Sequence, residues 1–362
     1  MALLLPILAT SHACHLLGAF QGSEDVSLWR NGVAFVTSGL ERKPGVVPPT
    51  TQPGMMLALN LTGDQTPRLA PMDLHGVPPD FDFRPHGMHI DNSTQRLYTV
   101  AHSPTQRQES VVVWDIVSGN SSSALPALRF RYALVSPNFT YHGPELTWFL
   151  NDVVAIDGEL ELLVTQFGPF NTSCVGPAAA CALPADKFLW RCTWDEADTR
   201  PDGRLPAHCT RALEEASRGL NGINIHRSST GRSRLWVNDL WTPQLWLLDR
   251  APDGTLARLG NVSLPGNIDN VERDSESGDL TMGMFCDRPT AEPVLRLPCG
   301  PGGLIFAKGN ASDDEHAAPV ITLEQDTSLS YQVSTSLIYG PWHVLGSPWA
   351  TGLLICRRAV HV

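Results

Sequence analysis

Short strand–turn–strand units recur along the chain, and this repetition restricts the possible folds more than any other feature. In each unit an apolar run is followed by a turn rich in Asp, Asn, Ser or Gly and then by a second apolar run, which is the pattern of a β-hairpin. The clearest units are 87–102, 153–167, 223–240 and 271–285. A third apolar run follows at 110–119, 244–250 and 302–309. The chain is therefore predicted to be all-β.

The spacing of the units indicates a β-propeller. Equivalent strand entries recur every 49 to 70 residues, whereas a propeller blade needs roughly 40–50, so six entries predict six blades with loop insertions. These entries are Asn31, His86, Asn151, Asn221, Asn270 and Ser334. We predict one six-bladed domain over residues 14–362, closed by strands from both termini and preceded by a leader-like segment at 1–13. The one hint of a helical period is at 211–218.

Composition and cysteine usage indicate the class of protein. With 362 residues and 42% hydrophobic content, the chain can bury a large core. A net charge of −11 without a long Lys/Arg run argues against nucleic acid as a partner. Eight cysteines, none in a C-x-x-C motif, and seven N-x-S/T sequons favour a secreted protein. The predicted glycosylation sites are Asn60, Asn92, Asn120, Asn138, Asn171, Asn261 and Asn310.

Acidic and amide side chains stand at the edges of several apolar runs. Any one of them is usually explained by turn chemistry, but a propeller brings the starts of its innermost strands to one central channel. Carboxylate and amide oxygens are the ligands of Ca²⁺, which takes six to eight. Since adjacent side chains in a strand point to opposite faces, the paired residues predict two ions in a central calcium channel. The residues are Glu24, Asp25, Asn151, Asp152, Asn221, Asp269 and Asn270.

Several longer segments resemble one known family, the serum paraoxonase/arylesterase family. These segments are CHLLGAFQGSEDVSLWRNGVAF (14–35), FRPHGMHI (83–90), LNDVVAI (150–156), GLNGINI (219–225), IDNVERDSESGDL (268–280) and LLICRR (353–358). The resemblance covers nearly the whole chain in order. It implies a six-bladed propeller with two Ca²⁺ in its channel, which hydrolyses aryl esters or lactones as small-molecule substrates.

The resemblance also implies a role for individual residues. His86 would take a proton from the attacking water, and His102 would orient His86 or relay the proton. Cys14 and Cys356 would form a disulfide between the two ends of the chain. The catalytic calcium would be held by Glu24, Asn151, Asn221, Asp269 and Asn270. The structural calcium would be held by Asp25, Asp152 and the backbone carbonyl of Met88.

The sequence departs from the family pattern where substrate or membrane contacts would lie. Phe285 or Cys286 stands in place of a further active-site histidine, and a Cys-rich loop at 174–192 replaces an aromatic membrane-binding helix. The N-terminal hydrophobic helix is also mostly missing, which argues against lipoprotein or membrane association. The remaining cysteines pair most simply as neighbours, 174 with 181, 192 with 209 and 286 with 299.

Two alternatives to this reading remain. No G-x-S-x-G, H-E-x-x-H or phosphate-loop motif is present, so a metal-activated water is the simplest mechanism for an enzyme. A gluconolactonase-like or strictosidine-synthase-like propeller enzyme is one alternative. A non-catalytic propeller that binds calcium for stability alone is the other. His89, on the strand of His86, is expected to be structural.

Overall fold

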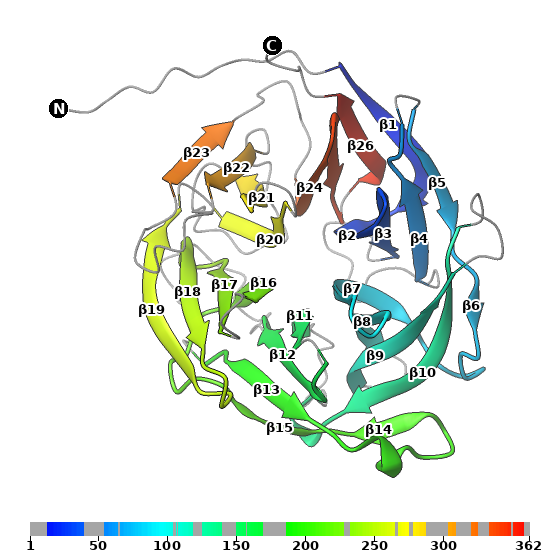
Figure 1. Cartoon of the computed structure of the whole chain (residues 1–362), viewed down its shortest axis with the longest axis vertical. Helices are drawn as coiled ribbons and strands as arrows, with labels where there is room; N and C mark the ends of the chain where they lie inside the picture. The colour runs from blue at the N-terminus through cyan, green and yellow to red at the C-terminus, as the bar shows by residue number, and fades with distance from the viewer. Residues whose placement is uncertain are drawn as a thin grey trace, which may run out of the picture.

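The described strands form six sheets that surround a common centre (Figure 1). Five of the sheets are four-stranded, and the sheet that contains β7 to β10 has six strands. This arrangement confirms the predicted all-β propeller. The computed structural model describes residues 13–39, 54–63, 66–103, 106, 108–118, 125–139, 150–156, 158–168, 186–227, 232–264, 267–274, 278–286, 303–308, 320–324, 333–348 and 350–357.

The first three sheets in chain order are built mainly from consecutive antiparallel strands. The first is β2 (Ser23–Arg30), β3 (Val33–Ser38), β4 (Met55–Asn60) and β5 (Arg68–Pro71). The second is β7 (Arg84–Asp91), β8 (Arg96–Ser103), β9 (Gln108–Val117) and β10 (Ala127–Val135), with β6 (Leu74–His75) and β14 (Arg204–Pro206) added alongside β10. The third is β11 (Leu150–Ala155), β12 (Glu161–Gln166), β13 (Leu189–Thr193) and β15 (His208–Arg211).

The other three sheets complete the ring. The fourth is β16 (Leu220–Arg227), β17 (Ser233–Asp239), β18 (Gln244–Arg250) and β19 (Leu256–Ser263). The fifth is β20 (Asn267–Arg273), β21 (Leu280–Cys286), β22 (Gly303–Lys308) and β23 (Val320–Glu324). The last is β24 (Thr335–Tyr339), β25 (Trp342–Gly346), β26 (Thr351–Arg357) and β1 (Ala13–Gln21). Two short 3₁₀ turns, Pro137–Phe139 and Glu196–Asp198, are the helical elements of the described residues.

The innermost strands form a closed ring around the centre. In order they are β2, β7, β11, β16, β20 and β24, and each contacts the next, with β24 returning to β2. Figure 1 shows these six strands surrounding the middle of the molecule. Residues that lie far apart in the sequence but at the same phase of the repeat are therefore brought together.

Apolar side chains fill the spaces between neighbouring sheets. Tyr98, Val153 and Trp194 belong to one buried cluster that joins the second and third sheets. Trp114 packs in another cluster, between the first and second sheets, where its ring meets Phe83 edge-on at 5.2 Å. Strands inside the sheets, such as β8 and β12, are therefore buried along nearly their whole length, whereas the outer strand β19 alternates between partly buried and exposed residues.

The last sheet takes one strand from the N-terminal end and three from the C-terminal end. β1 pairs with β26 in an antiparallel register that places Cys14 opposite Cys356, and the two form a disulfide. Closure by both termini and this predicted disulfide are confirmed. The predicted pairing of Cys192 with Cys209 is also confirmed.

Loss of the closing disulfide is expected to lower the free energy of unfolding by about 5 kcal/mol. The bridge spans a sequence separation of 342 residues, and a crosslink restricts the unfolded chain more as the loop grows. Denaturant unfolding of the Cys14→Ser/Cys356→Ser double variant measures this. Cys192→Ser/Cys209→Ser, whose loop has a separation of 17 residues, is the control and should lose less. Equal losses in the two variants would contradict the chain-entropy explanation.

Two local expectations were wrong. Asn31 does not enter an inner strand but lies in the β2–β3 turn, where Asn31 and Gly32 have φ values of 51° and 71°. Such a turn needs positive φ at both central residues, which favours Asn-Gly. Residues 211–218 form no helix, because Cys209 and Arg211 extend in β15 instead. The described residues contain no helix with the length and hydropathy needed to cross a membrane.

Candidate active site

The structure places the sequence-predicted metal ligands and His86 on the innermost strands, and all but Met88 lie in the first half or at the middle of their strand. Each of them is at most 4% exposed, so their polar atoms are removed from water. The set comprises Glu24 and Asp25 on β2, His86 and Met88 on β7, Asn151 and Asp152 on β11, Asn221 on β16, and Asp269 and Asn270 on β20. His102, from β8, is 1% exposed.

The register of five inner strands shifts by one residue at these positions, as in a β-bulge. A bulge places two residues of one strand opposite a single residue of its neighbour and redirects the side chains. All five bulges fall at the same phase of the repeat, so they aim the polar residues at the channel. The pairs are Glu24–Asp25 opposite Thr37, His86–Gly87 opposite Val100, Asn151–Asp152 opposite Thr165, Asn221–Gly222 opposite Asn238, and Asp269–Asn270 opposite Gly283.

Glycine occupies the second bulge position on β7 and β16, where a neighbouring inner strand lies close. A Cβ atom on Gly87 would lie 2.4 Å from Asp152 Oδ1. A Cβ atom on Gly222 would lie 2.6 Å from Asn270 Cα. Real Cβ atoms do not make such short contacts, so these two positions must lack a side chain for the inner ring to close around the polar residues.

Hydrogen bonds between the strands hold the bulges in place. The backbone N–H of Asp25 donates to Thr37 Oγ1 at 3.0 Å, and that of Asp152 donates to Thr165 Oγ1 at 2.9 Å. Thr165 Oγ1 donates to the Asn221 carbonyl at 2.6 Å. The Asn270 side chain donates to the Glu24 carbonyl at 2.8 Å. The first two bonds fix bulges within a sheet, and the last two join strands of different sheets.

The predicted ligands of the catalytic calcium, called the first group below, have donor atoms that suit a cation. Asn151, Asn221 and Asn270 each have a buried side-chain oxygen that no donor among the described residues reaches. An unsatisfied buried acceptor costs free energy, and three such oxygens beside two buried carboxylates form the hard-oxygen set that Ca²⁺ uses. The carboxylates are those of Glu24 and Asp269.

Asp25 and Asp152 form a second acidic group together with Glu272, which the sequence analysis did not single out. Burial raises the pKa of Asp25 to about 7, although N–H groups of Met88 and Val26 oppose this. Burial and the charge of Asp25 raise the pKa of Asp152 well above its usual value. Burial, then the charges of Asp25 and Asp152, do the same for Glu272. A cation bound between these carboxylates would offset their mutual repulsion and favour their ionised forms.

Neither group is a metal cluster built from acid, histidine and cysteine side chains alone. Within the described part of the chain, no three such side chains lie close enough together to hold an ion by themselves. The first group depends on amide oxygens, and the second would need the backbone carbonyl of Met88. The arrangement therefore matches oxygen-rich calcium ligation better than the nitrogen and sulfur ligation of zinc.

A continuous line of close polar contacts runs from Glu24 and Asn151 through the two predicted catalytic histidines. His86 Nε2 lies 3.0 Å from Glu24 Oε1 and 3.4 Å from Asn151 Nδ2. His86 Nδ1 lies 2.7 Å from His102 Nε2. His102 Nδ1 then lies 3.0 Å from Glu109 Oε1. No local signal in the sequence marks Glu109, because its pairing with His102 depends on the alignment of β8 and β9.

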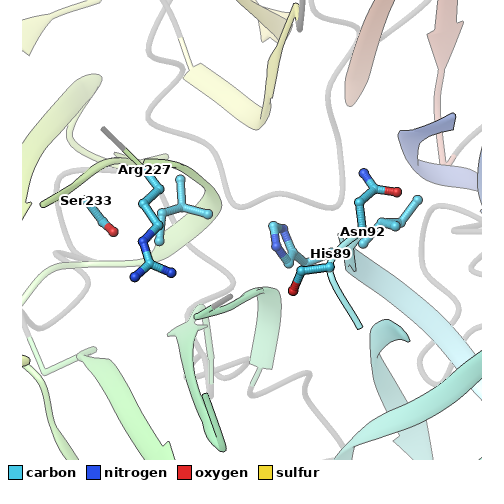
Figure 2. A pocket seen from close by; sticks show the side chains of 7 residues that line it. His89, Asn92, Arg227 and Ser233 are labelled. Carbon is cyan, nitrogen blue, oxygen red and sulfur yellow. The ribbon is translucent and has the colours of Figure 1, made fainter. Parts of the chain in front are cut away.

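His89 is directed away from this line, as its place three residues after His86 predicts. It lines a cavity of about 210 Å³ with Asn92, Arg227 and Ser233, and Figure 2 shows these four side chains around it. Burial lowers the pKa of His89 to about 4, so the ring is neutral at pH 7. The cavity lies near the far ends of β7 and β16 from the candidate active site.

Several predictions fall outside the described residues. They are the leader-like segment apart from Ala13, sequons Asn120, Asn171 and Asn310, Cys174, Cys181 and Cys299, and the side chains of Phe285 and Cys286. The other sequon asparagines lie on the surface or partly exposed: Asn60 at the end of β4, Asn92 after β7, Asn138 in the first 3₁₀ turn and Asn261 in β19.

Comparisons with known proteins point to one family. The Arylesterase family model matches residues 7–165. Serum paraoxonase/lactonase 3 of Mus musculus is 33% identical over 75% of this chain and 68% of its own length. Serum paraoxonase/arylesterase 1 of Homo sapiens is 24% identical over 78% of this chain and 75% of its own. A periplasmic gluconolactonase of Pseudomonas aeruginosa superposes with a TM-score of 0.49 at 11% identity, over 91% of this chain and 84% of that one.

Proposed function

Because the chain belongs to the serum paraoxonase/arylesterase family, we propose that it is a calcium-dependent hydrolase of aryl esters or lactones. The observation that carries the proposal is that the bulges of neighbouring inner strands carry two buried carboxylates and three buried amide oxygens, and that no described donor reaches the three amide oxygens. A pair of buried histidines lies directly beside them. A cation held by these oxygens could polarise a carbonyl, and the adjacent histidines could activate a water.

The catalytic calcium would be held by the first group of ligands in the central channel of six blades, one blade to each sheet. When bound, it would act as a Lewis acid that polarises the substrate carbonyl and stabilises the negative charge that develops on its oxygen. The donor set suits this task because two carboxylates and three neutral amides put less negative charge around the ion than an all-carboxylate site would, and so weaken its Lewis acidity less. The ligands are Glu24, Asn151, Asn221, Asp269 and Asn270.

The two histidines would move the proton of the attacking water. His86 presents Nε2 toward the ligands Glu24 and Asn151, so this nitrogen is the one placed to accept the proton. Its Nδ1 contacts His102 Nε2 at 2.7 Å, which allows a proton to leave the ring on the side away from the substrate. Proton transfer by a positioned imidazole typically contributes 10²–10⁴-fold to a rate.

A second, structural calcium would be held by Asp25, Asp152 and the carbonyl of Met88. Glu272 adds a third carboxylate, hydrogen-bonded to Asp25. These four residues come from four sheets, so an ion there would tie β2, β7, β11 and β20 together. We also propose that the protein is secreted and glycosylated, as its disulfides and sequons favour. Lipoprotein or membrane association is not part of the proposal.

Hydrolysis of phenyl acetate and of a panel of lactones tests the proposal. We expect turnover of at least one substrate, complete loss of turnover after exhaustive EGTA treatment, and recovery when calcium is restored. Elemental analysis of the purified protein should find about two calcium ions per chain. Full activity in calcium-free protein would rule out the metal mechanism, and absence of turnover in calcium-loaded protein would favour the non-catalytic alternative.

A further inference from the structure

The buried carboxylate of Glu109 stands at the end of the histidine line. Glu109 is the second residue of β9 and pairs directly across the strands with His102 of β8. The side chain has no exposed surface. Burying an ionised carboxylate is expensive unless hydrogen bonds replace its contacts with water. The hydrogen bonds of Glu109 therefore indicate which contacts offset the cost of burying its carboxylate.

Each oxygen of this carboxylate has a different partner. Oε1 lies 3.0 Å from His102 Nδ1, and Oε2 accepts the backbone N–H of Leu150 at 2.5 Å. Leu150 is the first residue of β11 and directly precedes the calcium-ligand candidate Asn151. One side chain thus contacts both the histidine pair and the strand whose bulge carries Asn151 and Asp152.

The contact with Oε1 decides how the His102 ring is used. A carboxylate only accepts, so His102 Nδ1 must carry the hydrogen. His102 Nε2 is then the nitrogen that faces His86 Nδ1 at 2.7 Å and can receive a proton from it. After that transfer His102 is an imidazolium, and Glu109 is the carboxylate beside its positive charge. A base oriented by a buried carboxylate on its other nitrogen is a recurring catalytic arrangement.

We propose that Glu109 is a positioning residue, which holds His102 in the proton-accepting tautomer and fixes the start of the calcium-binding strand β11. The proposal rests on the hydrolase function proposed above. It assigns Glu109 no contact with the substrate or the metal, and its effect on turnover passes through His102.

The Glu109→Gln variant separates the two contacts. Its amide oxygen can still accept the Leu150 N–H, so the strand start is preserved. The amide nitrogen would then face His102 Nδ1 and, as a donor, favour the opposite tautomer. We expect kcat to fall by roughly 10²–10³-fold with KM changed by less than about threefold, since an incorrect tautomer costs up to about 10⁴-fold where such pairs have been tested. Glu109→Asp, which keeps the charge, should recover part of the loss.

A matched control is available in Glu161→Gln. Glu161 is also a buried carboxylate, but it pairs with Arg250 and Arg191 at the opposite end of the third sheet. This variant should lose stability and keep the kcat and the pH–rate profile of the parent. In Glu109→Gln the pH–rate profile should change, while calcium content and calcium affinity stay within about twofold of the parent.

Proton NMR of the imidazole N–H groups in the calcium-loaded protein is a test that does not need turnover. A downfield N–H resonance that disappears in Glu109→Gln, persists in Glu161→Gln and remains in Glu109→Asp would support the assignment even if no substrate is found. The proposal would be overturned by a resonance that is unchanged in Glu109→Gln, or by a kcat of Glu109→Gln within threefold of the parent at every pH. If Glu109→Gln does not fold, Glu109→Asp decides, because its shorter side chain should not keep both contacts: a kcat equal to that of the parent would overturn the proposal.

Discussion

Asp269→Ala is expected to abolish ester and lactone hydrolysis while leaving the propeller folded. Asp269 lies at the bulge of β20 and is 1% exposed. It supplies one of the two carboxylates in the first ligand group, and three neutral amides with one carboxylate would hold a divalent ion weakly. A Lewis-acid metal contributes several kcal/mol to the transition state, and each 1.36 kcal/mol is tenfold in rate. We therefore expect a fall of at least about 10³-fold in kcat/KM.

The measurement is steady-state hydrolysis of phenyl acetate by the folded fraction of each variant, with circular dichroism to determine that fraction. Asp25→Ala is the matched control, because Asp25 is the next residue along β2 from Glu24 and is equally buried. It should reduce stability far more than specific activity. If both variants lose only stability and keep the specific activity of their folded fraction, the division into a catalytic and a structural ion is wrong.

Removal of calcium is expected to lower the melting temperature by more than any single substitution on the surface. The proposed ligands come from separate sheets, so bound ions would stabilise the native state over the unfolded chain. An ion present at a thousand times its dissociation constant contributes about 4 kcal/mol per site. Differential scanning calorimetry across a calcium titration measures the effect. A melting temperature that is independent of calcium would contradict both proposed sites.

The stability of the metal-free protein should depend on pH through the second group, the buried carboxylates of Asp25, Asp152 and Glu272. The pKa of Asp25 is raised from 3.8 to about 7 in the folded chain, so the folded state binds more protons than the unfolded state between these values. Stability should therefore be greatest below about pH 4 and fall as pH rises toward 7. Glu272→Gln should reduce this fall, because it removes one of the mutually repelling carboxylates, and should weaken the stabilisation by calcium. Glu161→Gln should change neither the fall in stability with pH nor the stabilisation by calcium.

Much of the architecture follows from local patterns in the sequence. Apolar runs separated by Asp-, Asn-, Ser- or Gly-rich turns specify hairpins such as β7–β8 and β16–β17, because alternating burial and turn chemistry act over a few residues. The position of Cys14 before the first blade and Cys356 at the end of the last strand matched a ring closed by both termini. The polar residues at the strand starts could be identified for the same reason, since the repeat gives them one phase.

The detailed site required the tertiary structure. A bulge depends on register between strands, so the sequence shows Asn151 and Asp152 as neighbours but not that both face Thr165. Asn31 is an amide residue beside an apolar run, like the true strand entries, but Asn31 and Gly32 adopt the positive φ values of a tight turn. Glu109 and Glu272 look like ordinary charged strand residues. Only packing removes them from water and places one beside His102 and the other beside Asp25, and contacts between residues distant in sequence carry no local signature.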